Sequence, residues 1–191
     1  KELKLKLCRL LLEKYAPLIN EHEKRTIGEI KGLVNSDDLT IQSILSDFKN
    51  KDYVFEDHYL EVAEKVFDFV SGEIQYADIE INLDYWLSPK EVFSSKIGDD
   101  TDLAVFLCSL LLGLGDESAA VVIAELDNLK THAFVATEFK GKFLLLDPSQ
   151  SHGFQAFSGT KENALQKYSF QGAKIKRFLY KFNHSTYEQF M

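Results

Sequence analysis

The fold is decided by the stretch KIGDDTDLAVFLCSLLLGLG, which begins at Lys96 and ends at Gly115. From Leu103 to Leu114 it is apolar nearly all the way round, interrupted only by Ser109 and Gly113. A helix with apolar residues on every side belongs inside a protein core. The run is also shorter than the roughly 18 apolar residues that a membrane span needs. The sequence therefore predicts a buried central helix and no stable insertion into a membrane.

Three acidic residues, Asp99, Asp100 and Asp102, stand directly before this helix. A carboxylate at a helix N-terminus accepts hydrogen bonds from backbone N–H groups that lack a partner within the helix, and it faces the positive end of the helix dipole. Capping therefore explains part of this acidic group. A further role depends on the residues that the fold brings to this end of the helix.

The residues before the central helix predict more helices. Apolar residues recur at helical spacing in the segments 3–15, 26–34, 36–48 and 57–70. Ser88, Pro89 and Glu91 form the pattern of a capping box at the start of a short helix. We therefore expect residues 1–84 to form a helical region packed on a core of residues 85–191, with one compact domain overall.

The residues after the central helix predict a sheet. Runs rich in β-branched and aromatic residues occupy 118–126, 131–139, 143–148 and 175–182, and a helical pattern occupies 161–168. The turn Lys140-Gly141-Lys142 favours a hairpin between the second and third runs. Helices followed by an antiparallel sheet make an α+β fold.

Composition limits the functions that are open to the chain. A net charge of −8, with only three arginines among 191 residues, argues against nucleic-acid binding, because phosphate contacts need a basic surface. Cys8 and Cys108 both lie in apolar helical patterns, so we expect free thiols and a cytoplasmic location. The chain opens on lysine, so the sequence does not exclude an upstream signal or anchor. No motif indicates a cofactor.

Three segments carry a resemblance to a known family. They are WLSPKEVFSSKIGDDTDLAVFLCSLLLGLG at 86–115, AAVVIAE at 119–125 and THAFVATEFKGKFLLLDPS at 131–149. Together they resemble the transglutaminase-like domains of the papain-like cysteine hydrolases and transferases. The resemblance covers about a third of the chain. The N-terminal helical region resembles an archaeal branch of that family.

The resemblance implies a role for individual residues. It places the catalytic base at His132, the acid that orients this base at Asp147, and the nucleophile at position 100. In the family this nucleophile is a cysteine, whose thiolate is stabilised by the helix N-terminus; here it is Asp100. Trp86 is expected either to line the binding cleft or to fill the core, and Asp99 to adjoin the cleft beside the nucleophile position.

Asp100 leaves three functional hypotheses open. A carboxylate is a poor nucleophile toward an amide, and Cys108 lies about 12 Å along the helix at 1.5 Å per residue. The favoured hypothesis is a noncatalytic protein whose cleft binds a peptide, a protein or a small ligand. The second is a thiol protease, amidase or transglutaminase whose cysteine has been replaced artificially. The third is a divalent-metal site formed by Asp100, His132 and Asp147.

Overall fold

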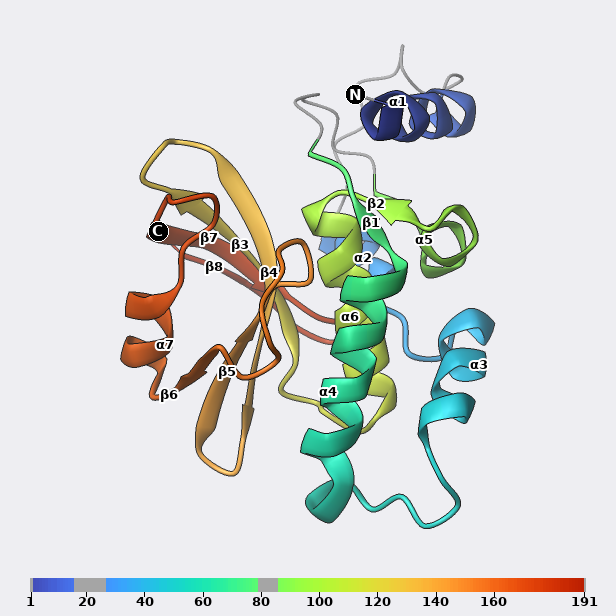
Figure 1. The fold of residues 1–191 in the computed structure, drawn as a ribbon, viewed down its shortest axis with the longest axis vertical. Helices are drawn as coiled ribbons and strands as arrows, with labels where there is room; N and C mark the ends of the chain where they lie inside the picture. Colours follow the sequence, from blue (N-terminus) through green and yellow to red (C-terminus); the bar gives the residue numbers. More distant parts are fainter. Residues whose placement is uncertain (1, 16–26, 79–85, 191) are drawn as a thin grey trace.

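The computed structural model describes residues 2–15, 27–78 and 86–190 (Figure 1). Its helices are α1 (Glu2–Tyr15), α2 (Ile27–Leu33), α3 (Leu39–Phe48), α4 (Phe55–Glu73), α5 (Pro89–Ser95), α6 (Asp100–Gly113) and α7 (Lys161–Lys167). Its strands are β1 (Gln75–Tyr76), β2 (Ile97–Gly98), β3 (Ala120–Leu126), β4 (Thr131–Phe139), β5 (Lys142–Leu146), β6 (Phe157–Gly159), β7 (Ile175–Phe182) and β8 (Tyr187–Gln189). The predicted α+β class is confirmed.

The main sheet is antiparallel and has the strand order β6-β5-β4-β3-β7-β8. Figure 1 shows α4 and α6 on one side of the sheet and α7 on the other. In β3, Val121 and Ile123 belong to the large core, whereas Val122 and Ala124 pack with Tyr168 in a second cluster. Because both of its faces are covered, the strand reads as a continuous apolar run instead of an alternating one.

Helix α6 lies at the centre of the large core. Its side chains from Asp102 to Leu112 are all buried, as its apolar circumference predicts. The same core cluster takes in Leu7 of α1, Ile41 of α3 and Phe67 of α4. The N-terminal helices therefore share one core with the sheet. The predicted boundary at residue 84 lies outside the described residues, so the division into 1–84 and 85–191 stays a prediction.

A short parallel pair, β1 with β2, positions the start of α6. Gln75 pairs with Ile97 and Tyr76 with Gly98, so the end of α4 lies beside the turn that leads into α6. Gly98 is packed so closely that an added Cβ would lie 2.8 Å from the Leu103 Cδ1 and 2.9 Å from the Asp102 Cβ. A residue with a side chain at position 98 would therefore displace the first turn of α6.

Two helices begin earlier in the sequence than predicted, and some short strands were not predicted. Helix α4 begins at Phe55, two residues before the expected segment 57–70, and α6 begins at Asp100, so that Asp100 and Asp102 belong to its first turn instead of preceding it. Strands β6 and β8 were not predicted, because three residues are too few to show an alternating pattern. None of the helices in the described ranges is long and apolar enough to cross a membrane.

Candidate functional site

The acidic residues at the start of α6 have separate roles. Asp99 is the N-cap: its Oδ1 accepts a hydrogen bond from the Asp102 N–H at 2.9 Å, and the Asp102 Oδ2 accepts one from the Asp99 N–H at 3.2 Å. The Asp102 Oδ1 also accepts the Leu87 N–H at 2.7 Å, which fixes the segment before α5 against α6. Asp99 and Asp102 thus form the predicted cap, and the pair leaves Asp100 free to point elsewhere.

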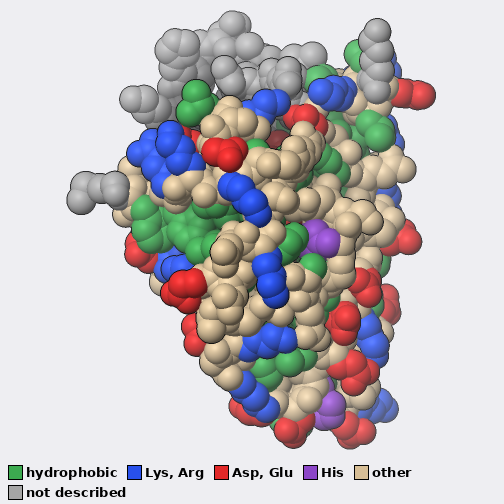
Figure 2. All heavy atoms as spheres, turned by 60° about the vertical axis from the view of Figure 1, so that its left-hand side comes forward, with side chains coloured by type: hydrophobic (Ala, Val, Ile, Leu, Met, Phe, Trp, Pro, Cys, Tyr) green, Lys and Arg blue, Asp and Glu red, His purple; other side chains and the backbone are tan. Residues whose placement is uncertain are grey.

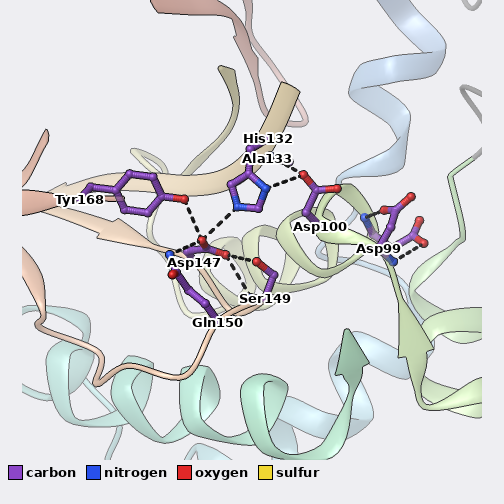
Figure 3. Close-up of polar contacts among 9 residues, drawn as sticks. Asp99, Asp100, His132, Ala133, Asp147, Ser149, Gln150 and Tyr168 are labelled. Carbon is purple, nitrogen blue, oxygen red and sulfur yellow. Dashed lines mark hydrogen bonds and ion pairs between the residues drawn. The ribbon is translucent and has the colours of Figure 1, made fainter. Parts of the chain in front are cut away.

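Asp100 points from the first turn of α6 toward β4 (Figure 3). Its Oδ2 accepts the Ala133 N–H at 2.8 Å and lies 2.9 Å from the Nδ1 of His132. The His132 side chain is buried, whereas 21% of the Asp100 side chain is exposed. The helix and the strand therefore meet through one carboxylate oxygen at the position that the resemblance assigns to the nucleophile.

Asp147 contacts the other side of the same imidazole. Its Oδ2 lies 3.0 Å from the His132 Nε2, so the ring stands between two carboxylates. The same oxygen accepts hydrogen bonds from the Tyr168 hydroxyl at 2.8 Å and the Gln150 amide at 2.7 Å. The Oδ1 accepts the Ser149 N–H at 3.0 Å and hydroxyl at 2.6 Å. Asp147 is fully buried and has hydrogen-bond partners at both oxygens.

This arrangement favours a charged imidazole. Burial alone would lower the pKa of His132, but the hydrogen bonds and negative charges of Asp100 and Asp147 outweigh it and raise the pKa to about 9. Burial alone would raise the pKa of Asp147, but the His132 contact and the donors around it hold that pKa below its usual value. At neutral pH the site therefore consists of an imidazolium ion between two acidic side chains.

The cap carboxylates behave differently. Burial and repulsion from Asp102 and Asp100 raise the pKa of Asp99 well above its ordinary value. Burial raises the pKa of Asp102 to about 6, although hydrogen bonds from the backbone of Leu87 and Asp99 oppose the shift. Asp99 and Asp102 thus bind protons more readily than isolated carboxylates do.

Aromatic rings close the site on one side. Phe170 stacks on His132 with ring centroids 3.7 Å apart and planes at 17°, and Tyr76 packs edge-on against Phe170 at 6.1 Å. Sequence analysis missed Tyr168, which donates to Asp147, as well as Phe170. Both lie after α7, far from the recognised motifs, and the segment KYSFQG gives no signal of its own.

The remaining predicted residues lie elsewhere. Trp86 stacks on Phe182 of β7, with centroids 5.7 Å apart and planes at 9°, and packs against the large core. This favours the core-filling role that the sequence left open for it. Cys108 is buried within α6, and burial raises the pKa of its thiol. A buried neutral thiol is a small apolar residue and not a replacement nucleophile.

A pocket of about 300 Å³ lies beside the cluster of His132 and Asp147, between the end of α4 and the loop that follows β5. Ser149 and Gln150, which donate to Asp147, also line this pocket, as does Tyr76, which contacts Phe170. Contacts thus link the pocket to the His132 site directly. The protein has a concave surface beside the cluster where a ligand could be held.

The geometry does not favour the metal-site hypothesis. A histidine ligand needs one ring nitrogen directed at the metal, but each nitrogen of His132 faces a carboxylate. Within residues 2–15, 27–78 and 86–190, no group of three or more His, Cys, Asp and Glu side chains converges in a way that could hold a metal ion.

Comparisons with known proteins support the fold. Residues 84–174, just under half of the chain, match a family model described as the CEP76 peptidase-like domain. A structure of LapG from Legionella pneumophila has a TM-score of 0.56 and 19% sequence identity, over 93% of this chain and 87% of LapG. No curated protein sequence matches the chain.

Two further LapG structures agree with the first. The calcium-bound form has a TM-score of 0.55 and 18% identity over 93% of this chain and 87% of LapG. The EGTA-treated form has a TM-score of 0.55 and 18% identity over 94% of this chain and 86% of LapG. At such identities the likeness shows the fold alone. The chain has the papain-like, transglutaminase-like fold, and the resemblance of its N-terminal region to an archaeal branch stays a prediction.

Proposed function

We propose that this protein is a noncatalytic member of the papain-like, transglutaminase-like fold and that it binds a peptide at the site beside Asp147. The observation that supports this most directly is the position of His132 between two carboxylates, 2.9 Å from Asp100 and 3.0 Å from Asp147. The fold and a concave surface are retained, while the chemistry of the cluster is that of an ion pair.

A cysteine hydrolase or transferase needs a histidine that can take and return a proton. The nitrogen that would face the thiol must act as a base and then as an acid. In this protein that nitrogen, the His132 Nδ1, donates to the Asp100 carboxylate, and the raised pKa keeps the proton on the ring at neutral pH. No thiol is present at position 100 to exchange this proton with the ring, so the proton stays within the His132–Asp100 pair.

Asp100 does not replace the thiolate either. Attack of a carboxylate on an amide carbonyl gives a mixed anhydride, which is a high-energy intermediate, and it expels an amine, which is a poor leaving group. The Oδ2 of Asp100 is moreover occupied by the Ala133 N–H at 2.8 Å. The hypothesis of an artificially replaced cysteine makes the same prediction for the chain as it stands, namely no acyl transfer.

The proposal is tested by assaying amide hydrolysis and amine transfer to a glutamine peptide with the wild-type protein and His132→Asn. We expect no turnover from either protein above the uncatalysed rate. Turnover by the wild-type protein that His132→Asn abolishes would overturn the proposal.

A second measurement tests the assignment of position 100. Asp100→Cys places a thiol at the start of α6, at the position whose side chain contacts the Ala133 N–H and His132. Thr101→Cys places a thiol on the same helical turn and serves as the matched control. At pH 6.5, iodoacetamide should alkylate the new thiol of Asp100→Cys at least about tenfold faster than that of Thr101→Cys, because a neighbouring imidazolium lowers a thiol pKa. Equal rates for the two variants would contradict the assignment.

A further inference from the structure

The pocket beside Asp147 has features that the His132 cluster does not explain. One wall is the last turn of α4 and the segment after it; the other is the loop after β5. The lining residues are Asp68, Ser71, Gly72, Ile74, Tyr76, Pro148, Ser149, Gln150, Ser151 and His152. No lysine or arginine is among these described lining residues, and the only formal charge is that of Asp68.

The hydrogen bonding of His152 shows which group it presents. Its Nδ1 lies 3.1 Å from the carbonyl oxygen of Gly153, which can only accept, so Nδ1 carries a hydrogen. In the neutral ring the Nε2 is then an acceptor. The ring is held in place by stacking on Phe67 at 5.6 Å and by an edge contact with Phe157 at 4.7 Å.

Two of the residues that line this pocket each have one buried polar atom without a partner. Neither the His152 Nε2 nor the Ser71 Oγ has a hydrogen-bond partner among the described residues, although both atoms are shielded from solvent. Within a helix a serine hydroxyl often bonds the carbonyl four residues earlier, but that of Ser71 does not. Buried polar atoms without partners are rare, and they commonly mark a site that a ligand or water completes.

The surroundings of the pocket are negative. Ser71 and Gly72 belong to the last turn of α4, where unpaired carbonyl groups give the helix end a partial negative charge. Asp68 lines the pocket itself, and along the whole of α4 the acidic side chains outnumber its one lysine, Lys65, which is paired with Glu61. Figure 2 shows acidic side chains gathered along one edge of the molecule. A positively charged ligand would be drawn to this side of the protein.

Tyr76, on the wall of the pocket, lies near a second set of carboxylates, outside α4. Burial raises the pKa of its hydroxyl above the ordinary value, and nearby carboxylates, led by Asp100 and Asp78, raise it further. The phenol therefore stays neutral at physiological pH and adds no charge to the pocket.

From the pocket and its two unpaired atoms we infer that it receives the guanidinium group of an arginine side chain in a peptide ligand. A guanidinium has five N–H donors in a planar fork, so it can donate to the His152 Nε2, the Ser71 Oγ and the Asp68 carboxylate together. An ammonium group donates from a single point. The inference rests on the proposed function, because it names the class of peptide that the noncatalytic site holds.

The test is isothermal titration calorimetry with acetyl-Ala-Arg-Ala-amide and with the same peptide carrying citrulline, which has the shape of arginine without the charge. We expect the arginine peptide to bind at least about tenfold more tightly than the citrulline peptide. Asp68→Asn and His152→Phe should remove this preference; the phenyl ring keeps the stacking on Phe67 and loses the acceptor. The matched control is Glu64→Gln, which removes an exposed charge on the same helix outside the pocket lining.

Equal binding of the two peptides, or the same loss in Glu64→Gln as in Asp68→Asn, would overturn the inference. Methylguanidinium distinguishes a peptide from a free small molecule. If methylguanidinium binds at least about tenfold more weakly than the arginine peptide, the result supports a peptide as the ligand. If the two bind equally tightly, the inference of a peptide ligand is overturned. Mass spectrometry of the titrated peptide separates the two proposals: cleavage contradicts the noncatalytic function, whereas intact peptide without arginine preference contradicts only the inference.

Discussion

Two buried aspartates lie in different parts of the core and are held in nearly the same way. The Asp147 Oδ1 accepts the N–H and hydroxyl of Ser149, at 3.0 and 2.6 Å. The Asp116 Oδ1 accepts the N–H and hydroxyl of Ser118, at 3.1 and 2.7 Å. In each case the serine follows two residues after the aspartate, which is the geometry of an Asx turn.

The second oxygens distinguish the two sites. The Oδ2 of each aspartate accepts a tyrosine hydroxyl, from Tyr168 for Asp147 and from Tyr59 for Asp116. At Asp116 the remaining donor to the Oδ2 is the neutral hydroxyl of Thr137 at 2.6 Å, whereas at Asp147 the Oδ2 also accepts from the Gln150 amide and contacts the imidazole of His132. Burial and hydrogen bonding of a carboxylate are therefore common to a structural turn and to the candidate site. The charged partner and the neighbouring pocket are what mark the site at Asp147.

The largest expected difference comes from neutralising each carboxylate. Asp147→Asn leaves the buried His132 charge with a single partner, so we expect a loss of about 3 to 5 kcal/mol in the free energy of unfolding at pH 7. Asp116→Asn breaks only contacts to backbone and hydroxyl donors, and the hydroxyls can rotate to accept from the amide, so the loss should be about 1 kcal/mol. Urea unfolding of both variants measures the difference. Equal losses would show that the imidazole adds nothing to the way Asp147 is held.

The second prediction concerns the dependence of stability on pH. The pKa of His132 is raised from 6.5 to about 9 in the folded protein, so its stabilising contribution is complete below pH 6.5 and is lost as the pH rises toward 9. The shift corresponds to roughly 3 kcal/mol over this range. The free energy of unfolding should therefore fall more steeply with pH in the wild-type protein than in His132→Asn.

The Asp116 network supplies the control for this measurement. Burial and the charge of Asp116 raise the pKa of Tyr59 above its ordinary value of 10, so its hydroxyl stays protonated between pH 6.5 and 9. Tyr59→Phe should lower stability by the same amount at every pH in this range and keep the wild-type slope. A flattened slope in Tyr59→Phe, or an unchanged slope in His132→Asn, would place the titrating group elsewhere.

The sequence predicted most of the fold because its strongest patterns are long. The apolar run of α6, the β-branched runs of β3 to β5 and the capping box at Ser88 and Glu91 all lie where they were expected. Short elements were missed, since β6 and β8 have only three residues each and their pairing depends on the neighbouring strands. Local pattern specifies an element only when the element is long enough to repeat it.

The site was predicted less completely than the fold. Motif order placed Asp100, His132 and Asp147 together, but it gave no indication that Asp116 is held like Asp147, because the sequence GDES has no strand-ending proline to draw attention to it. Tyr168, Phe170 and the pocket wall at Ser71 come from distant segments that only the tertiary fold assembles. The sequence thus indicated the three residues at the centre of the site and not those that hold or surround them.

The smallest effect expected is that of removing one tyrosine hydroxyl from each aspartate. Tyr168→Phe and Tyr59→Phe each take away one donor to a buried carboxylate and should each cost about 0.5 to 1 kcal/mol in the free energy of unfolding. Only Tyr168→Phe should also affect His132: a less stabilised Asp147 carboxylate shares the proton more strongly, so the pKa of His132 should rise slightly. Titration of the His132 ring by NMR measures this shift.

Whether the His132 pKa shifts in Tyr168→Phe alone decides if the hydroxyl of Tyr168 acts on the imidazole. If the His132 pKa moves in Tyr168→Phe and not in Tyr59→Phe, the hydroxyl acts on the imidazole through Asp147, and the two tyrosines differ because only one of their aspartates has a charged partner. If both variants leave the pKa unchanged, the Tyr168 hydroxyl does not act on the ring through Asp147. The hydroxyl of Tyr168 would then have the same structural role at Asp147 as the hydroxyl of Tyr59 has at Asp116, namely to satisfy a buried carboxylate.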